Sequence, residues 1–258
     1  YTLYKMDRNN GGNKGSVNLS GWGQWSSSST YAPYDGLEVV DGKLWRITRN
    51  RYAARYNLTT GKFDGVYFYT TPGSSYVENT FMKDGKLCVG SYGRNDMNCY
   101  ELPDANLGSL NRNISMNTYS HGGGYHNKYS EFWYNNYSSS TIYRYDRNGK
   151  AMGNFNGGHT NVRQIATNGT EDAYYMARYG SSASASGVNS SYTYIVKNKG
   201  KTSTKIWQAA ASSYMSSVAV DGATVYSQRY YSSHPTVYMM KSTTGQSLGS
   251  FNLTGSIG

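Results

Sequence analysis

The chain is short of charge, proline and cysteine. Only 16% of its 258 residues are charged, and it holds four prolines and two cysteines. No run approaches the roughly 18 consecutive apolar residues that a membrane-spanning helix needs. No segment combines a long 3.6-residue apolar period with helix caps. We therefore expect no membrane span and almost no helix.

Residue patterns that bind metals or perform catalysis are also missing. The two cysteines form no CxxC motif, and the histidines are far apart in sequence, at His121, His126, His159 and His234. The run Gly245-Gln-Ser247-Leu-Gly249 imitates a nucleophile elbow, and His121-Gly-Gly-Gly124 imitates an oxyanion motif. A hydrolase of that type needs Asp and His after the serine, and the residues after Ser247 include neither. We expect no enzyme, no cofactor and no metal.

Aromatic residues and turn-forming residues are abundant. Aromatics make up 15% of the chain, with 28 tyrosines, and there are 30 glycines. Tyr, Thr, Val and Trp favour half-buried strands, whereas Gly, Asn, Ser and Asp favour turns. This composition predicts many short strands joined by tight turns.

A repeated unit runs along the chain. Its first half is an apolar strand, an Asp-Gly or Asn-Gly turn and a second strand, and its second half is a hairpin that closes on Gly. Copies return about every 44 to 51 residues, which matches the blade period of β-propellers. The first half is clearest at Leu37–Trp45, Thr80–Cys88 and Ser217–Tyr226, and the second half at Ala54–Phe63, Ile142–Lys150 and Val237–Gln246.

The repeat predicts an all-β fold, a single β-propeller domain over residues 1–258 built from four-stranded antiparallel blades. The inner strands are expected to include Leu37–Val40, Val162–Thr167 and Ser217–Val220. Six outer hairpins accompany five inner pairs, so five blades are favoured and six are the alternative. The N-terminal hairpin within residues 1–21 either completes the last blade and closes the ring or is half of a sixth blade.

The stretch from Gly122 to Asp146 resembles the olfactomedin domain. A Gly-rich turn leads into a tyrosine-rich hairpin and then into Ile142-Tyr-Arg-Tyr145-Asp146, like that family's Ile-X-Lys/Arg-Tyr-Asp strand. The resemblance implies a five-bladed secreted domain with a role in matrix or adhesion. The family's central calcium site needs carboxylates that Val162–Thr167 lacks, so no calcium is expected.

A disulfide between Cys88 and Cys99 is predicted from the repeat. Aligning the copies places Cys88 on the second strand of a blade and Cys99 on the third, which are antiparallel neighbours. Directly opposed residues in such a pair bring their Cβ atoms close to the separation that a disulfide needs. Stable disulfides belong to oxidising compartments, so the pair predicts secretion. Two buried free thiols in a cytosolic protein are the alternative.

Other residues indicate binding. Trp22 and Trp25 lie in a Gly/Ser-rich loop, where they suit either sugar stacking or the filling of a groove between blades. The net charge of +10 is scattered, so we expect weak, salt-sensitive contact with anionic polysaccharide and no specific nucleic acid. The chain has seven potential N-glycosylation sites, at Asn18, Asn57, Asn113, Asn136, Asn168, Asn189 and Asn252.

The function expected from these features is a non-enzymatic extracellular module for adhesion, matrix or assembly that acts through protein contacts. Contacts between copies of the chain (self-assembly) are one kind of contact that this expectation includes. A carbohydrate-binding lectin propeller is the first alternative. A secreted hydrolase is the second.

Overall fold

The computed structural model describes most of the chain, and all structural statements concern the described part. That part consists of residues 2–8, 12–18, 36–40, 42–47, 52–70, 77–83, 86–91, 95–102, 110–115, 122–136, 138–178, 193–211, 215–229 and 236–252. The chain divides into two compact units, Tyr1–Ser120 and His121–Gly258.

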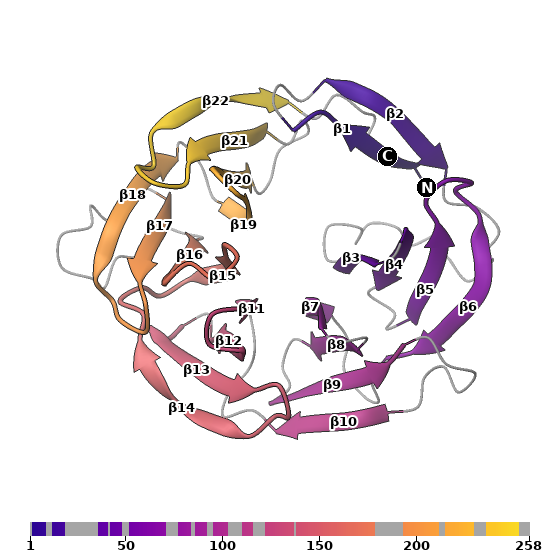
Figure 1. Cartoon of the computed structure of the whole chain (residues 1–258), viewed down its shortest axis with the longest axis horizontal. Coiled ribbons are helices and arrows are strands. Elements are labelled where there is room, and N and C mark those ends of the chain that lie inside the picture. The colour runs from indigo at the N-terminus through magenta and orange to yellow at the C-terminus, as the bar shows by residue number, and fades with distance from the viewer. Residues whose placement is uncertain are drawn as a thin grey trace. The chain divides into compact units, whose positions relative to one another are not determined.

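The first unit contains, within its described residues, one two-stranded and two four-stranded antiparallel sheets (Figure 1). The two-stranded sheet is the hairpin β1 (Thr2–Met6) and β2 (Asn13–Asn18). The next sheet has β3 (Gly36–Val40), β4 (Lys43–Ile47), β5 (Tyr52–Asn57) and β6 (Phe63–Tyr69). The third has β7 (Val77–Lys83), β8 (Lys86–Ser91), β9 (Asp96–Glu101) and β10 (Leu110–Ser115).

The second unit contains three four-stranded antiparallel sheets among its described residues. The first has β11 (Gly122–His126), β12 (Glu131–Asn135), β13 (Thr141–Asp146) and β14 (Ala151–Asn156). The second has β15 (Val162–Thr167), β16 (Ala173–Arg178), β17 (Thr193–Lys199) and β18 (Lys205–Ala211). The third has β19 (Met215–Asp221), β20 (Thr224–Arg229), β21 (Thr236–Lys241) and β22 (Ser247–Asn252).

The described residues contain strands and turns and no helix, so the all-β prediction is confirmed. In each four-stranded sheet the strands follow one another in chain order, because every connection is a hairpin. The predicted inner strands fall on β3, β15 and β19. Among the described residues, none belongs to a helix that would be long and apolar enough to cross a membrane.

The N-terminal hairpin forms a sheet of its own. The last sheet already has its four strands from β19 to β22, and β1 and β2 pair only with each other in the described residues. The expectation that this hairpin completes the last sheet is therefore not met. The chain nonetheless pairs the hairpin as predicted, with Leu3 opposite Val17.

Neighbouring sheets in each unit share a hydrophobic core. In the first unit Trp45 and Phe68 from one sheet pack with Leu87, Val89 and Tyr100 from the next. In the second unit the sheets β11–β14 and β15–β18 bury a cluster that includes Trp133, Ile165 and Tyr174, while Trp207 and Val218 belong to the cluster shared with β19–β22. Burying aromatic side chains between sheets supplies much of the hydrophobic stabilisation.

The three glycines of Gly122–Gly124 have a packing role. A Cβ at Gly124 would lie 2.5 Å from the carbonyl oxygen of Ile165, and one at Gly122 would lie 2.7 Å from that of Arg163. The missing side chains therefore let β11 approach the backbone of β15. This close approach accounts for the sequence that imitates an oxyanion motif.

Candidate functional site

A paired position recurs on the second and third strands of the sheets. In three sheets an aromatic side chain on the second strand lies opposite a basic side chain on the third: Trp45 and Arg55, Trp133 and Arg144, and Tyr175 and Lys197. The basic groups of Arg55 and Lys197 lie 5.7 Å and 5.1 Å from the centroids of their aromatic partners. Cation–π contacts of this kind hold the two strands in register.

Each basic member of these pairs also binds a carboxylate. Arg55 donates to Asp64 at 2.7 Å, Lys197 donates to Glu171, and Arg144 donates to both oxygens of Glu131, at 2.8 and 2.9 Å. The bidentate Arg144–Glu131 geometry is the strongest of these ion pairs.

Glu131 is the centre of a polar network. Its residue is only 4% exposed, and besides Arg144 it accepts hydrogen bonds from Trp133 Nε1 and Lys201 Nζ, each at 2.9 Å. Burial alone would raise the pKa of Glu131, but the hydrogen bonds from Arg144, Trp133 and Lys201 outweigh it and lower the pKa to about 2. Lys201 follows β17, so the network ties two neighbouring sheets together.

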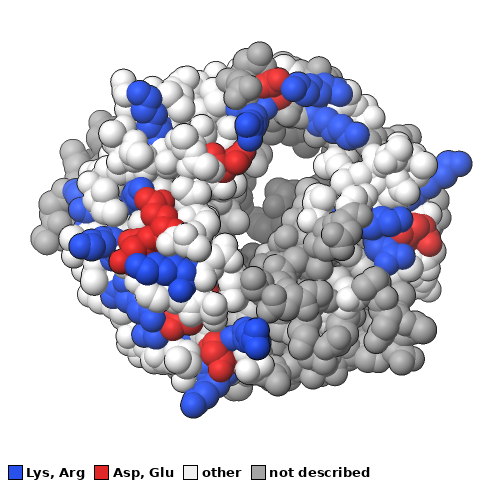
Figure 2. Space-filling view, viewed as in Figure 1, with Lys and Arg blue, Asp and Glu red and all other residues white. Residues whose placement is uncertain are grey.

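A second set of contacts links the same two sheets beside this network. Tyr129 donates its hydroxyl to Asp172, which also pairs with Lys128 at 3.0 Å. Lys201 Nζ lies 4.0 Å from the centroid of the Tyr129 ring. Figure 2 shows acidic side chains flanked by basic ones on this part of the second unit. The charges neutralise one another locally.

His126 lies behind Tyr129 and is fully buried. Its ring is 4.7 Å from that of Tyr129 and 4.3 Å from that of Trp133, measured between centroids. Burial lowers its pKa to about 4, although Asp172, the backbone of Ala173 and Glu131 act in the opposite direction. His126 is therefore neutral at physiological pH and serves as part of an aromatic stack.

The equivalent network in the next sheet runs through Ser242. The buried Lys197 ammonium donates to the Ser242 carbonyl at 2.8 Å, and Trp207 Nε1 donates to the same oxygen at 2.9 Å. Ser242 lies in the turn after β21, so these contacts join the sheet β15–β18 to the sheet β19–β22. These aromatic, basic and acidic residues of the second unit thus form hydrogen bonds and ion pairs that connect neighbouring sheets.

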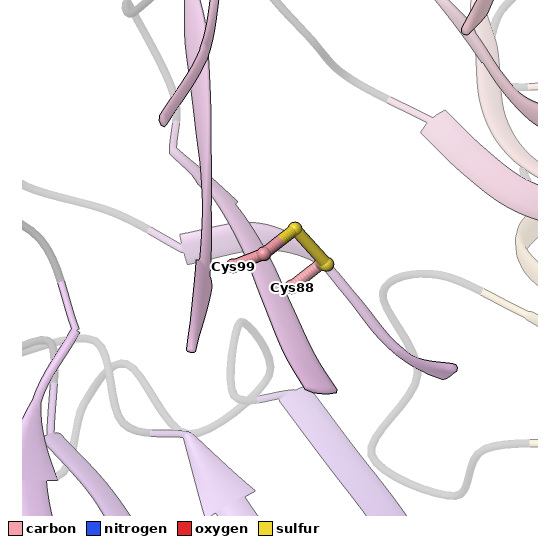
Figure 3. Close-up of a disulfide and its surroundings, with 2 residues drawn as sticks. All are labelled: Cys88 and Cys99. Carbon is pink, nitrogen blue, oxygen red and sulfur yellow. A yellow bond between two sulfur atoms is a disulfide. The ribbon is translucent and has the colours of Figure 1, made fainter. Parts of the chain in front are cut away.

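In the third sheet of the first unit, the corresponding position holds the disulfide. Cys88 on β8 and Cys99 on β9 are register partners whose Cα atoms are 4.0 Å apart, and their sulfurs are bonded (Figure 3). The repeat alignment had placed the two residues on these neighbouring strands. Both cysteines are buried.

The remaining predicted residues are dispersed. Ser247 is exposed on β22 and its hydroxyl accepts a hydrogen bond from the Gly249 amide at 3.1 Å, in a strand that follows a hairpin turn. His159 is buried in the loop before β15, and burial lowers its pKa to about 4. Trp22, Trp25, His121, His234 and Asn189 lie outside the described residues.

The asparagines of the predicted glycosylation sites differ in their hydrogen bonds and in their positions on the sheets. Asn57 and Asn136 accept backbone hydrogen bonds within their own turns, from Thr59 and Ser138. Asn168 donates its amide nitrogen to the Gly222 carbonyl at 2.9 Å. Asn252 is exposed at the end of β22. Asn18 and Asn113 lie on β2 and β10.

A feature that sequence analysis missed lies on the last strands of the sheets in the second unit. In β14, β18 and β22 the register shifts by one residue, and the bulge contains Met152, Ile206 and Leu248, respectively. These side chains are 41%, 47% and 44% exposed, which makes them three of the few large apolar residues left in solvent. β-bulges re-aim side chains in this way. An apolar residue followed by Gly, as in Met152-Gly153 and Leu248-Gly249, was the available signal.

Comparisons with known proteins support the fold only. No family model matches the chain, and no curated protein matches it. Among solved structures the chain is similar to the crystal structure of the computationally designed Ika8 protein, with a TM-score of 0.54 and 11% identity. The match covers 83% of this chain and 60% of the designed chain, so this chain spans less than two thirds of it.

Proposed function

We propose that this chain is a non-enzymatic extracellular binding module, a β-propeller of five four-stranded blades that contacts other proteins through its outermost strands. The hairpin β1–β2 is an additional half blade in this proposal. The five four-stranded sheets of the described residues and their hairpin connections support it. The Cys88–Cys99 disulfide supports secretion, because stable disulfides form in oxidising compartments.

The observation that carries the proposal is the row of exposed apolar residues on β14, β18 and β22. Met152, Ile206 and Leu248 occupy one structural position in three successive sheets. A single exposed apolar residue needs no explanation, but the same exposure repeated at one position indicates a surface that contacts something else. By contrast, Glu131, Glu171 and Asp172 are bound to basic or hydroxyl groups within the fold, which suits a structural role for them.

The test is site-specific photo-crosslinking. A photoreactive amino acid is placed at Met152, Ile206 or Leu248, and, as controls, at the exposed turn positions Lys62 and Thr243. The proteins are incubated with an extracellular protein fraction and illuminated. Protein adducts formed from the three row positions and not from the controls support the proposal.

Equal adducts from row and control positions would contradict it. So would a specific signal on a glycan array that is lost when Trp22 and Trp25 are replaced by Ala. That second outcome would favour the lectin alternative, since those two aromatics are its candidate contacts.

A further inference from the structure

The strands β14 and β22 are edge strands without charge. Each is the last strand of its sheet, so one side of its backbone has no strand beside it in the described residues. Five of the six residues in each strand are exposed. The sequences Ala151-Met-Gly-Asn-Phe-Asn156 and Ser247-Leu-Gly-Ser-Phe-Asn252 contain no charged residue and no proline. Exposed edges of this kind are templates for pairing with another strand.

The first unit treats the same position differently. In β2 the bulge contains Lys14, which pairs with Asp7 at 2.7 Å. In β6 the residue before the bulge glycine is Asp64, which pairs with Arg55. Charges on an edge strand oppose pairing with a second chain. In β14 and β22 the residue before the bulge glycine is instead the uncharged Met152 or Leu248.

β14 and β22 also share one backbone shape. Gly153 and Gly249 have φ values of 89° and 108°, which only glycine adopts readily. After each bulge a short stretch pairs regularly with the neighbouring strand: residues 154–156 in β14 and residues 249–252 in β22. Each edge therefore offers a short regular stretch of free backbone next to one exposed apolar side chain.

We propose that β14 and β22 are two self-complementary edges through which copies of this chain join, strand to strand and antiparallel. The proposal rests on the proposed function and names a second copy of the chain as the partner. A second copy fits because each edge meets another uncharged edge strand, so no unpaired charge is placed at the junction. The regular stretches are only three residues long in β14 and four in β22, so each junction is small and its affinity is weak.

The net charge of the chain sets the conditions for association. A formal charge of +10 makes copies repel one another at low ionic strength. Salt screens this repulsion, with a Debye length of about 10 Å at 0.1 M and about 3 Å at 1 M. Contacts between uncharged edges do not weaken with screening. Association therefore strengthens as salt is added, opposite to the behaviour of an interface made of ion pairs.

The experiment is sedimentation velocity over a range of protein concentrations, in low and in 0.5 M salt (roughly a 4 Å Debye length). The protein is made without glycosylation, because the potential acceptor Asn252 lies on β22 itself. The variants are Met152→Lys, Leu248→Lys and the double variant. Val39→Lys is the matched control, since Val39 is 60% exposed on β3, which is the first strand of its sheet and not the last.

The expected result follows from two edges per copy. The unmodified chain forms assemblies larger than dimers at high concentration and in high salt. Each single variant stops at dimers, and the double variant is at least tenfold weaker in association. Val39→Lys assembles like the unmodified chain. The pair Asn154→Asp and Ser250→Asp lowers the net charge and still blocks assembly, which separates edge pairing from overall repulsion.

A chain that stays monomeric at every concentration and salt overturns the inference, and so does a double variant that assembles as well as the unmodified chain. Retained β-sheet circular dichroism verifies that each variant is folded. Failure here is distinguishable from failure of the proposed function, because crosslinks from Ile206 on β18 to a different protein would remain.

Discussion

The sheets join their second and third strands with two kinds of chemistry, and the first unit uses both, since its sheet β3–β6 pairs Trp45 with Arg55. In the sheet β7–β10 of the first unit, the paired position holds the Cys88–Cys99 disulfide. In the second unit it holds Trp133 with Arg144 in one sheet and Tyr175 with Lys197 in another. One backbone position therefore accepts a covalent bond or a cation beside an aromatic ring. The position is fixed by the fold, and its chemistry is free to vary.

The difference matters for how neighbouring sheets are held. A disulfide over a short loop restrains one hairpin and contributes about 3 kcal/mol or less in the chain-entropy model. Arg144 and Lys197, by contrast, bring in carboxylates, and their networks reach the adjacent sheets through Lys201 and Ser242. We infer that the networks of the second unit couple whole sheets, whereas the disulfide acts locally.

The largest expected effect comes from breaking the network at Glu131. Glu131→Gln removes the buried charge that Arg144 and Lys201 share and leaves the half-buried Arg144 guanidinium without its ion partner. Removing one partner of a buried pair costs about 3 to 5 kcal/mol. We expect the second unit to lose about 3 kcal/mol, measured by hydrogen exchange of its strands under native conditions.

The matched control is Asp64→Asn in the first unit. Asp64 binds Arg55 and Lys43, but no contact from Asp64 reaches an adjacent sheet among the described residues. We expect a loss of about 1 kcal/mol, confined to the sheet β3–β6. If Glu131→Gln had the smaller effect of the two, the coupling role of its network would be wrong.

Much of the strand pattern could be predicted from the sequence because the same turn residues recur in each copy of the repeat and mark where strands end. Asp-Gly and Thr-Gly turns located β3, β19 and the hairpins, since their glycines need positive φ, as at Gly42 and Gly245. The alignment of those turns also placed Cys88 opposite Cys99. Local rules suffice wherever a position is defined by its nearest turn.

The networks could not be predicted in the same way. Glu131 gathers Arg144 from the third strand of its sheet and Lys201 from the next sheet, 70 residues away. No spacing rule relates these residues, because their proximity depends on how two sheets pack. The bulge residues were missed for another reason: an extra residue in an outer strand looks like ordinary variation in repeat length until the register is known.

Acid provides an intermediate test, because every histidine belongs to the second unit and none occurs in residues 1–120. His126 and His159 have pKa values lowered to about 4 from an ordinary 6.5, in both cases chiefly by burial. The unfolded chain therefore takes up protons first, and stability falls as the pH drops from about 6.5 toward 4. Glu131, with its pKa near 2, loses its contribution only below about pH 4.5.

Between pH 7 and about pH 5.7 we expect the second unit to lose about 2 kcal/mol and the first unit to change little. His126→Phe keeps an aromatic ring between Tyr129 and Trp133 and cannot take up a proton, so it should remove about half of that loss. Hydrogen exchange of both units at the two pH values measures it. An equal loss in both units would show that the histidines are not responsible.

The smallest change in stability, and the sharpest test of the difference between the outer edges, comes from Lys14→Leu. It converts β2 from Asn-Lys-Gly-Ser-Val-Asn to Asn-Leu-Gly-Ser-Val-Asn, which closely matches β22. The Lys14 side chain is 63% exposed, so water screens its ion pair with the half-buried Asp7 and loss of the pair costs less than about 0.5 kcal/mol. Yet β2 then carries no charge on its edge, and a third joining edge is created. We expect an unchanged melting temperature and stronger salt-promoted assembly in sedimentation velocity, whereas Lys14→Arg leaves both unchanged. Stronger assembly would mean that one charge at the bulge decides whether an outer strand is open to pairing; no gain would mean that the bulge itself closes the edge.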